Sequence, residues 1–379
     1  MPDRIYSRRT FSRTALQSLA AALAMPRIQS QDFRHDLPTG DGFIRISFNE
    51  NNYGPSPKAL QALTTCGAIA SRYPFSSELA VAQAIADYHG VKPENVALGC
   101  GSTEILRVAD AAFLAPEKNL VVAEPTFEAV LEYSGVEHSD VVKVPLTADH
   151  RHDLPHMADS CTSKTGLVYI CNPNNPTATI VTRDAMADFI GRVPPTTLIL
   201  VDEAYFDFVD DPRYASVLDL IPQHPNLVMA RTFSKIFGMA GMRLGYAVGA
   251  PETLAGMRKF LNQDNTNAAV LAAALASLSD RAYIAGCREK FIATRKWISV
   301  ELAKDGRNFT DSQANFLMID VGGDVRPVIA EFRKRKILIG RRFPSMGNWI
   351  RVSIGKQDEM ETFVAALREV VPAHASKAA

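Results

Sequence analysis

The chain has 379 residues, of which 47% are hydrophobic and 22% charged, so it is long enough to bury a large core and to form two domains. Its 41 basic and 41 acidic side chains balance, which gives no indication of nucleic acid or an anionic membrane surface as a partner and favours a small molecule. Five widely spaced cysteines include no Cys-x-x-Cys pair, so we expect no metal site and no redox couple.

The first thirty residues resemble a bacterial twin-arginine export signal. Arg8-Arg9 precedes an apolar run at 15–25, and residues 22–24 offer a small-residue cleavage site. The run is shorter than the roughly 20 apolar residues of a membrane-spanning helix, so we expect no stable membrane insertion. We therefore expect a leader at 1–30 and export to the periplasm. A disordered basic leader and an organellar transit peptide are the alternatives, and the protein is cytoplasmic if the leader is not used.

Beyond residue 40, short β-rich runs alternate with helix-like segments, which is typical of an α/β layered fold. We expect an N-terminal arm at 31–55, followed at 56–265 by a large domain that has a mostly parallel sheet with helices on both faces. The expected strands are 96–98, 120–123, 167–171, 197–201, 227–230 and 246–248.

The pattern changes after about residue 265. Helices are expected at 268–279 and 282–305. Strands are expected at 315–320, 337–339 and 349–354. These elements predict a smaller α+β domain over residues 266–379.

Polar and glycine-rich groups follow the ends of the expected strands of the large domain. In parallel sheets ligands bind beyond the carboxyl ends of the strands. We therefore expect one site to gather all five groups, which are residues 99–103, 124–127, 172–176, 202–205 and 232–235.

A lysine stands among small and apolar residues between positions 232 and 246. Burial disfavours the ammonium form, so Lys235 is a candidate Schiff-base lysine. The hydroxyl groups of Thr232 and Ser234 and the guanidinium of Arg243 are suited to holding a phosphate beside it. This combination indicates pyridoxal phosphate.

Two further groups fit the same cofactor. Gly101, Ser102 and Thr103 precede a helix-like run, so backbone N–H groups and the helix dipole would face the phosphate. A serine or threonine in that place can instead be a simple N-cap. Asp202 stands at a strand end, where a carboxylate would keep the pyridine nitrogen protonated. Its alternative is a helix cap.

The motifs, in order and spacing, resemble the fold-type I pyridoxal-phosphate aminotransferases of class I/II, and the histidinol-phosphate aminotransferase group most. The resemblance covers about residues 46–355. The shared motifs lie at 49–57, 72–74, 101–104, 124–127, 172–177, 202–205, 234–235, 241–245 and 350–355.

The resemblance assigns roles to four more cofactor residues. It implies that Asn175 and Tyr205 hydrogen-bond the phenolic oxygen of the cofactor and that Phe127 stacks on its ring. It also implies a homodimer with shared sites, in which Tyr73 reaches the phosphate of the neighbouring subunit. The alternatives are a turn residue for Asn175, a core residue for Phe127 and a buried turn aromatic for Tyr73.

The substrate is expected on the C-terminal strand. Alternation at 349–354 separates Arg351 from three apolar residues, so its guanidinium can hold a substrate α-carboxylate. A solvated strand arginine is the alternative. Arg341 or Arg342 lies near the place where the group has a second anion-binding arginine, although residues 340–344 depart from its usual form. Tyr53 and Asn175 complete the expected substrate residues.

The resemblance implies an enzyme that moves an amino group between an amino acid, or a histidinol-phosphate-like amine, and a 2-oxo acid by a ping-pong mechanism. The same scaffold also supports lyases, decarboxylases and oxidase/hydroxylases. A transcription regulator would need a DNA-binding module, for which the region before residue 40 is too short. Lys235, Asp202 and Arg351 argue against a cofactor-binding relic.

Overall fold

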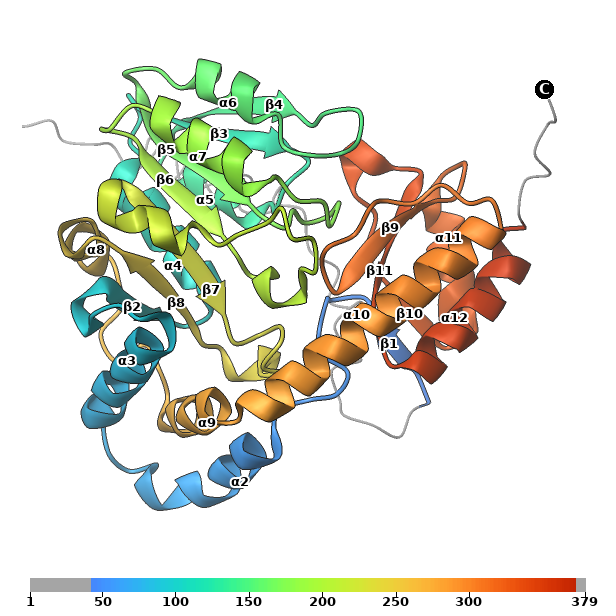
Figure 1. Cartoon of the computed structure of the whole chain (residues 1–379), viewed down its shortest axis with the longest axis horizontal. Coiled ribbons are helices and arrows are strands. Elements are labelled where there is room, and N and C mark those ends of the chain that lie inside the picture. Colours follow the sequence, from blue (N-terminus) through green and yellow to red (C-terminus); the bar gives the residue numbers. More distant parts are fainter. Residues whose placement is uncertain (1–41, 373–379) are drawn as a thin grey trace, which may run out of the picture. The chain divides into compact units, whose positions relative to one another are not determined.

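A seven-stranded sheet forms the centre of this computed structural model, which describes residues 42–372 (Figure 1). The strand order is β2-β8-β7-β6-β5-β3-β4. Strands β3 to β7 are parallel, and β8 is antiparallel to its neighbours β7 and β2, so the predicted mostly parallel sheet is confirmed. The strands are β2 (Val96–Gly99), β3 (Asn119–Glu124), β4 (Asp140–Pro145), β5 (Thr165–Cys171), β6 (Leu198–Asp202), β7 (Leu227–Thr232) and β8 (Gly245–Gly249).

Both faces of this sheet are covered by helices. The central strands β5 to β8 are buried at every position, as expected for apolar parallel strands that have no solvent-exposed face. Alternate strand residues pack on α4 (Ser102–Phe113), α5 (Ala129–Val136) and α8 (Pro251–Arg258). The remaining ones pack on α6 (Leu154–Ser160) and α7 (Arg183–Arg192) on the opposite face.

A helical layer packs beside the sheet and contains α2 (Pro57–Thr65), α3 (Phe75–His89) and α9 (Ala268–Ser279), with α9 against both of the others. The side chains of Ser56 and Asn267 cap α2 and α9 by accepting from backbone N–H groups of the first turn. The predicted domain boundary at residue 265 falls just before α9, and it stays a prediction.

The C-terminal part contains two small sheets. Strand β11 (Trp349–Ser353) pairs antiparallel with β9 (Phe316–Asp320), and β1 (Ile44–Ile46) pairs parallel with β10 (Ile337–Ile339). The helices α10 (Arg281–Lys304), α11 (Val325–Lys334) and α12 (Gln357–Val370) surround them (Figure 1). Strand β1 comes from the N-terminal arm, so the arm is tied to this part of the fold.

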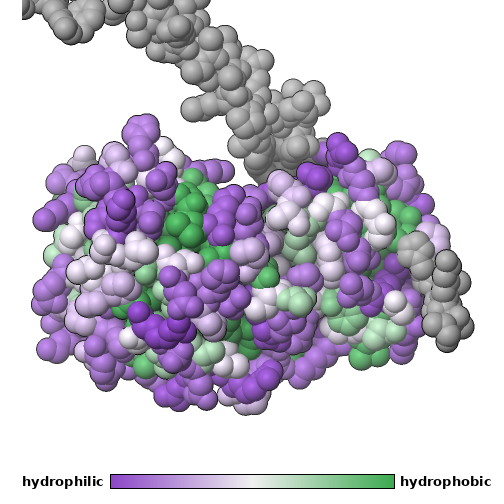
Figure 2. Space-filling model, turned by 90° about the horizontal axis from the view of Figure 1, so that it is seen from above, coloured by the Kyte–Doolittle hydropathy of each residue, from purple (hydrophilic) through white to green (hydrophobic). Residues whose placement is uncertain are grey.

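Short 3₁₀ helices complete the fold: η1 (Cys66–Ile69), η2 (Pro93–Asn95), η3 (Phe206–Phe208), η4 (Val217–Gln223), η5 (Ala240–Met242) and η6 (Pro344–Met346). The face seen in Figure 2 is mostly hydrophilic, with apolar residues in small groups. Within residues 42–372, no single helix has the length and apolar character needed to cross a membrane, and α9 with α10 meets that test only as a pair bent by 80°. The predicted leader at 1–30 lies outside the described residues.

Candidate active site

Lys235 lies in the loop that follows β7, at the carboxyl edge of the sheet. Its Nζ donates a hydrogen bond to the carbonyl of Phe48, 3.2 Å away, and lies 5.6 Å from the centre of the Tyr205 ring. Burial, together with the charge of Arg351, lowers the pKa of Lys235 to about 8. The amine is therefore neutral in part of the molecules at neutral pH, as nucleophilic or base chemistry requires.

The expected phosphate-binding residues meet around the guanidinium of Arg243. It donates to Ser234 Oγ and Thr103 Oγ1, each 3.2 Å away. Thr103 lies in the first turn of α4, whose N-cap is Gly101 with a φ of 77° and no side-chain cap. The simple N-cap alternative for Ser102 or Thr103 is therefore wrong, and the first N–H groups of α4 stay available to an anion.

Close backbone contact shapes this cradle. A Cβ atom on Gly101 would overlap Arg243 Nη2, and one on Gly245 would lie 2.7 Å from Ser102 Cα. Arg243 itself has a φ of 62°, a left-handed conformation that turns the chain into β8. Thr232 Oγ1 accepts from the backbone N–H of Ser234 at 3.1 Å, which fixes the loop that precedes Lys235.

Asp202 is the last residue of β6 and is buried between Cys171 of β5 and Ala230 of β7. Its Oδ2 accepts from the hydroxyl of Tyr169 at 3.0 Å, and its Oδ1 accepts from the N–H of Ala204 at 3.1 Å. Burial raises the pKa of Asp202 to about 6, against the opposing effect of the Tyr169 hydrogen bond. No α-helix begins at Ala204, so the carboxylate is not a helix cap. It is suited to a protonated ring nitrogen.

Sequence reasoning missed Tyr169. Its signal was a hydroxyl-bearing aromatic within the otherwise apolar strand β5, two residues before that strand ends. A buried tyrosine needs a hydrogen-bond partner. The residue that ends the neighbouring strand provides one.

Tyr205 is held by the N-terminal arm. Its hydroxyl accepts from Asn49 Nδ2 at 3.1 Å, and Asn49 Oδ1 accepts from the hydroxyl of Ser353 at 3.2 Å. The ring meets Phe316 edge-on, with 4.9 Å between ring centres, and burial raises the pKa of Tyr205. Strand β11, the arm and the large sheet thus meet at one point. Asn49 was named in the sequence analysis only as the first residue of the shared motif at 49–57, without a role of its own.

Arg351 is buried, so the alternative of a solvated strand arginine is wrong. Every position of β11 is buried, because its second face lines this site rather than solvent. Nη1 of Arg351 donates to Asn175 Oδ1 and Nη2 donates to the carbonyl of Ser47, each at 2.8 Å. Nε is buried and has no partner among the described residues. Burial lowers the pKa of Arg351 to about 10, and the arginine keeps one donor for a ligand oxygen.

Phe127, Tyr53 and Tyr73 form no hydrogen bond with the residues described so far, and their surroundings are as follows. Phe127 packs partly buried on the α4–α5 face, and Thr126 next to it donates to Asn174 Oδ1 at 2.9 Å. The Tyr53 ring packs edge-on against Phe291 of α10, 5.4 Å between centres. Tyr73 is 74% exposed, so the alternative of a buried turn aromatic is wrong.

The two candidate distal arginines point in different directions. Arg341 forms an ion pair with Glu128, the residue after Phe127. Arg342 lies near Gly347, where an added Cβ would come within 3.0 Å of its Nη2, and its charge lowers the pKa of Asp324. The structure therefore brings Arg341, and not Arg342, toward the segment that contains Phe127.

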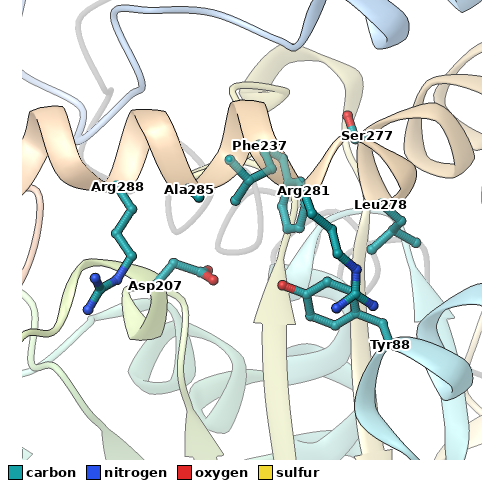
Figure 3. A pocket seen from close by; sticks show the side chains of 9 residues that line it. Tyr88, Asp207, Phe237, Ser277, Leu278, Arg281, Ala285 and Arg288 are labelled. Carbon is teal, nitrogen blue, oxygen red and sulfur yellow. The ribbon is translucent and has the colours of Figure 1, made fainter.

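A pocket of about 250 Å³ lies elsewhere (Figure 3). Tyr88, Asp207, Phe237 and side chains of α9 and α10 line it, and none of the expected site residues does. In residues 42–372, no group of three His, Cys, Asp or Glu side chains could hold a metal ion.

The arrangement fits pyridoxal phosphate in three independent ways. The glycine-shaped cradle at the start of α4, with Arg243, Thr103 and Ser234, suits a phosphate. The buried carboxylate of Asp202 suits a pyridinium nitrogen. Lys235, with its lowered pKa, suits a carbonyl carbon. The fold and the site therefore define an α/β enzyme that uses pyridoxal phosphate.

Comparison with known proteins identifies the family. The profile of the aminotransferase class I and II family matches residues 41–367. The chain belongs to this family, and it is a pyridoxal-phosphate-dependent transaminase.

The chain is similar to relatives that are named for two different aminotransferase activities. A histidinol-phosphate aminotransferase from Moorella thermoacetica is 36% identical over 331 residues, which are 86% of this chain and 85% of the relative. An aromatic amino acid aminotransferase from Rhodococcus jostii is 35% identical over 324 residues, 86% of this chain and 89% of the relative. The crystal structure of histidinol-phosphate aminotransferase from Sinorhizobium meliloti, in complex with pyridoxal-5'-phosphate, has a TM-score of 0.82 and 27% identity, and the match covers 92% of this chain and 98% of that one.

Proposed function

We propose that the enzyme transfers the amino group of an α-amino acid to a 2-oxo acid in a ping-pong mechanism, and that Arg351 binds the α-carboxylate of both. The observation that supports this proposal is the Nε–H of Arg351, which is buried and has no partner among the described residues. The two Nη atoms of the same guanidinium donate to Asn175 and Ser47. A buried donor of this kind is costly unless a ligand oxygen accepts from it. An anionic substrate group meets that requirement.

The residues around Lys235 would hold the cofactor. Arg243, Thr103, Ser234 and the first N–H groups of α4 are suited to its phosphate, and Asp202 to its ring nitrogen. The cofactor, when bound, supplies an electron sink for negative charge at the substrate Cα.

Further contacts follow from the family resemblance. Tyr205 and Asn175 would contact the phenolic oxygen and Phe127 the ring. Of these, the amide oxygen of Asn175 already accepts from Arg351 Nη1 at 2.8 Å, so Asn175 can link the cofactor side of the site to the substrate side.

Lys235 is the residue that we assign to proton transfer. Its pKa of about 8 lets the amine accept a proton from Cα and return it during one turnover near neutral pH. Asp202 and Arg351 act on its titration in opposite directions, the carboxylate raising and the guanidinium lowering its pKa. Burial has the largest effect on this pKa, and the charges of Arg351, Glu50 and Asp202 adjust it further.

Spectral titration of the purified holoenzyme tests this proposal. Amino acids should bleach the absorption band of the bound cofactor, and 2-oxo acids should restore it. Lys235→Ala should retain cofactor without normal turnover, whereas the exposed Lys259→Ala should behave as the wild type. Release of CO₂ or peroxide without any 2-oxo acid would instead favour a decarboxylase or an oxidase.

We infer a homodimer from the exposed apolar side chains that lie on α2, on η1, in the turn before α3 and at the start of α3. They are Leu60, Ile69, Tyr73, Phe75 and Leu79, each at least 42% exposed. Another copy of the chain would remove this surface from water, and Tyr73 would then reach the phosphate of the neighbouring subunit. In sedimentation experiments, the wild type should have the mass of a dimer and Leu79→Asp the mass of a monomer. A wild type that sediments as a monomer would contradict the inference.

We propose export by the twin-arginine route on the basis of Arg8-Arg9 and the apolar run after it. Fractionation of the producing cell tests this. Periplasmic protein shortened near residue 24 is the expected result, and full-length protein found exclusively in the cytoplasm contradicts it.

A further inference from the structure

One ion pair joins segments from the two parts of the fold beside the substrate arginine. Glu128 immediately precedes α5 on the large sheet, and Arg341 follows β10 of the C-terminal part. The carboxylate and the guanidinium are in direct contact although 213 residues separate them. Their side chains are 38% and 54% exposed. The pair is therefore accessible to a ligand.

Phe343 connects this pair to Arg351. Its buried ring lies 4.4 Å from the guanidinium carbon of Arg341 and 5.1 Å from that of Arg351. Both guanidinium groups thus contact the same aromatic ring. The charges of both Arg341 and Glu128 reach Arg351, since the first lowers its pKa and the second raises it. A substrate anchored on Arg351 therefore binds close to both.

The ion pair of Glu128 and Arg341 lies next to apolar side chains on its buried side. Phe343 belongs to a buried cluster with Met318, Met346 and Trp349. The position before Arg341 is a glycine, where an added Cβ would lie 3.1 Å from the Cβ of Arg351. The backbone of β11 and the Arg351 side chain thus leave little room for a side chain at position 340.

An ion pair of this exposure is weak, because solvent screens it and two flexible side chains must be held in place. A second anionic group on a substrate can therefore open it by taking the guanidinium. Glu128 must then lose its partner. A substrate with an uncharged far end requires no such exchange.

We propose that Glu128 is a specificity-determining residue, the resting counter-ion of Arg341, which competes with a second anion on the substrate and so favours amino acids whose far end is uncharged. This inference rests on the proposed binding of the α-carboxylate by Arg351. It assigns the substrate preference to a carboxylate on one part of the fold that neutralises an arginine on the other.

The test compares two amino acids on the holoenzyme. The kcat/KM for cofactor bleaching is measured with L-phenylalanine and with L-glutamate, in the wild type, Glu128→Gln, Arg341→Gln and the double variant. Glu128→Gln should raise the glutamate-to-phenylalanine ratio about fivefold, the size expected when a half-exposed ion pair no longer has to be opened. Arg341→Gln should lower the ratio, and adding Glu128→Gln to it should change nothing further.

Lys143→Gln is the matched control, because it breaks another half-exposed ion pair, with Glu124 at 3.0 Å, and both residues of that pair are 44% exposed. It should leave the ratio at the wild-type value. An unchanged or lower ratio in Glu128→Gln, or an equal rise in the Arg341→Gln background, would overturn the inference. Failure of every α-amino acid in the spectral titration to bleach the wild-type cofactor would refute the proposed function itself, so the two failures are distinguishable.

Discussion

Replacing Tyr169 by phenylalanine removes one hydroxyl group that supports the buried carboxylate of Asp202. That hydroxyl donates to Oδ2 at 3.0 Å, and both side chains are buried. The pKa of Asp202 is raised to about 6 by burial and is held down by this hydrogen bond. In Tyr169→Phe the ionised form loses a donor, so its pKa must rise.

The magnitude follows from the strength of that bond. A hydrogen bond to a charged group contributes about 1.5–3 kcal/mol, and about 1.4 kcal/mol corresponds to one pKa unit, so we expect a rise of about 1–2 units. In its proposed role, Asp202 must be ionised to keep the ring nitrogen protonated. Activity is therefore present above the pKa of Asp202 and is lost as the pH falls through it. The acid limb of the profile of kcat against pH should move upward by at least about one unit.

The assay measures kcat for the holoenzyme between pH 5 and 9 with saturating amino acid and 2-oxo acid. Tyr246→Phe is the control, since this buried tyrosine on the same sheet forms a 2.8 Å hydrogen bond with His89 instead. Its acid limb should stay where the wild-type limb lies. A Tyr169→Phe profile that falls uniformly, with no shift of the acid limb, would refute the role of Tyr169 in holding Asp202 ionised.

Three further predictions follow from particular contacts. Arg351→Lys loses the Nε–H donor and the planar guanidinium that Asn175 and Ser47 hold, so it should raise KM for amino acids about 10–100-fold with a smaller change in kcat, and an unchanged KM would remove Arg351 from the substrate site. Gly245→Ala pushes on the start of α4 and should weaken pyridoxal-phosphate binding to the apoenzyme about tenfold in a fluorescence titration, whereas Gly241→Ala, with open space around it, should not. Asp110 is buried with both oxygens unpartnered, and burial raises its pKa from 3.8 to about 8, so its carboxyl contributes stability at low pH that is lost as the pH rises from about 4 to 8. Asp110→Asn should therefore gain about 4 kcal/mol over the wild type between pH 5 and pH 8.5 in urea unfolding, and a pH-independent difference would contradict this.

The sheet was predictable where burial is complete. Strands β5, β6 and β7 are buried on both faces, so their sequences are continuous apolar runs that only a central strand explains. Strand β4 was not predicted, because it lies at the sheet edge and mixes half-buried with exposed residues, among them Asp140 and Lys143. An edge strand is specified by its neighbour more than by its own sequence.

The residues that we expect to hold the cofactor could be proposed from the sequence for a related reason, and their roles stay predictions. Gly101, Arg243 and Asp202 sit at strand ends or turns whose backbone geometry restricts the residue type, so each leaves a local signal. The alternatives weighed for Arg351 and Tyr73 were wrong because they depend on exposure. Exposure is decided by segments hundreds of residues away in sequence. The faces of β11 illustrate this, since alternation correctly separated Arg351 from the apolar side but could not show that both sides are buried.

The substrate side depends most on such long-range pairing. Arg341 considered alone is a cation near the site and predicts affinity for an anion. When its ion pair with Glu128 is taken into account, the charge of Arg341 is already neutralised. The pair therefore predicts that a substrate with a second anionic group is disfavoured. Nothing in the local sequence of either residue indicates the other, because their contact exists only after the C-terminal part packs beside the large sheet. We therefore expect an exchange at position 128 of this chain to change its substrate preference while leaving every cofactor motif intact.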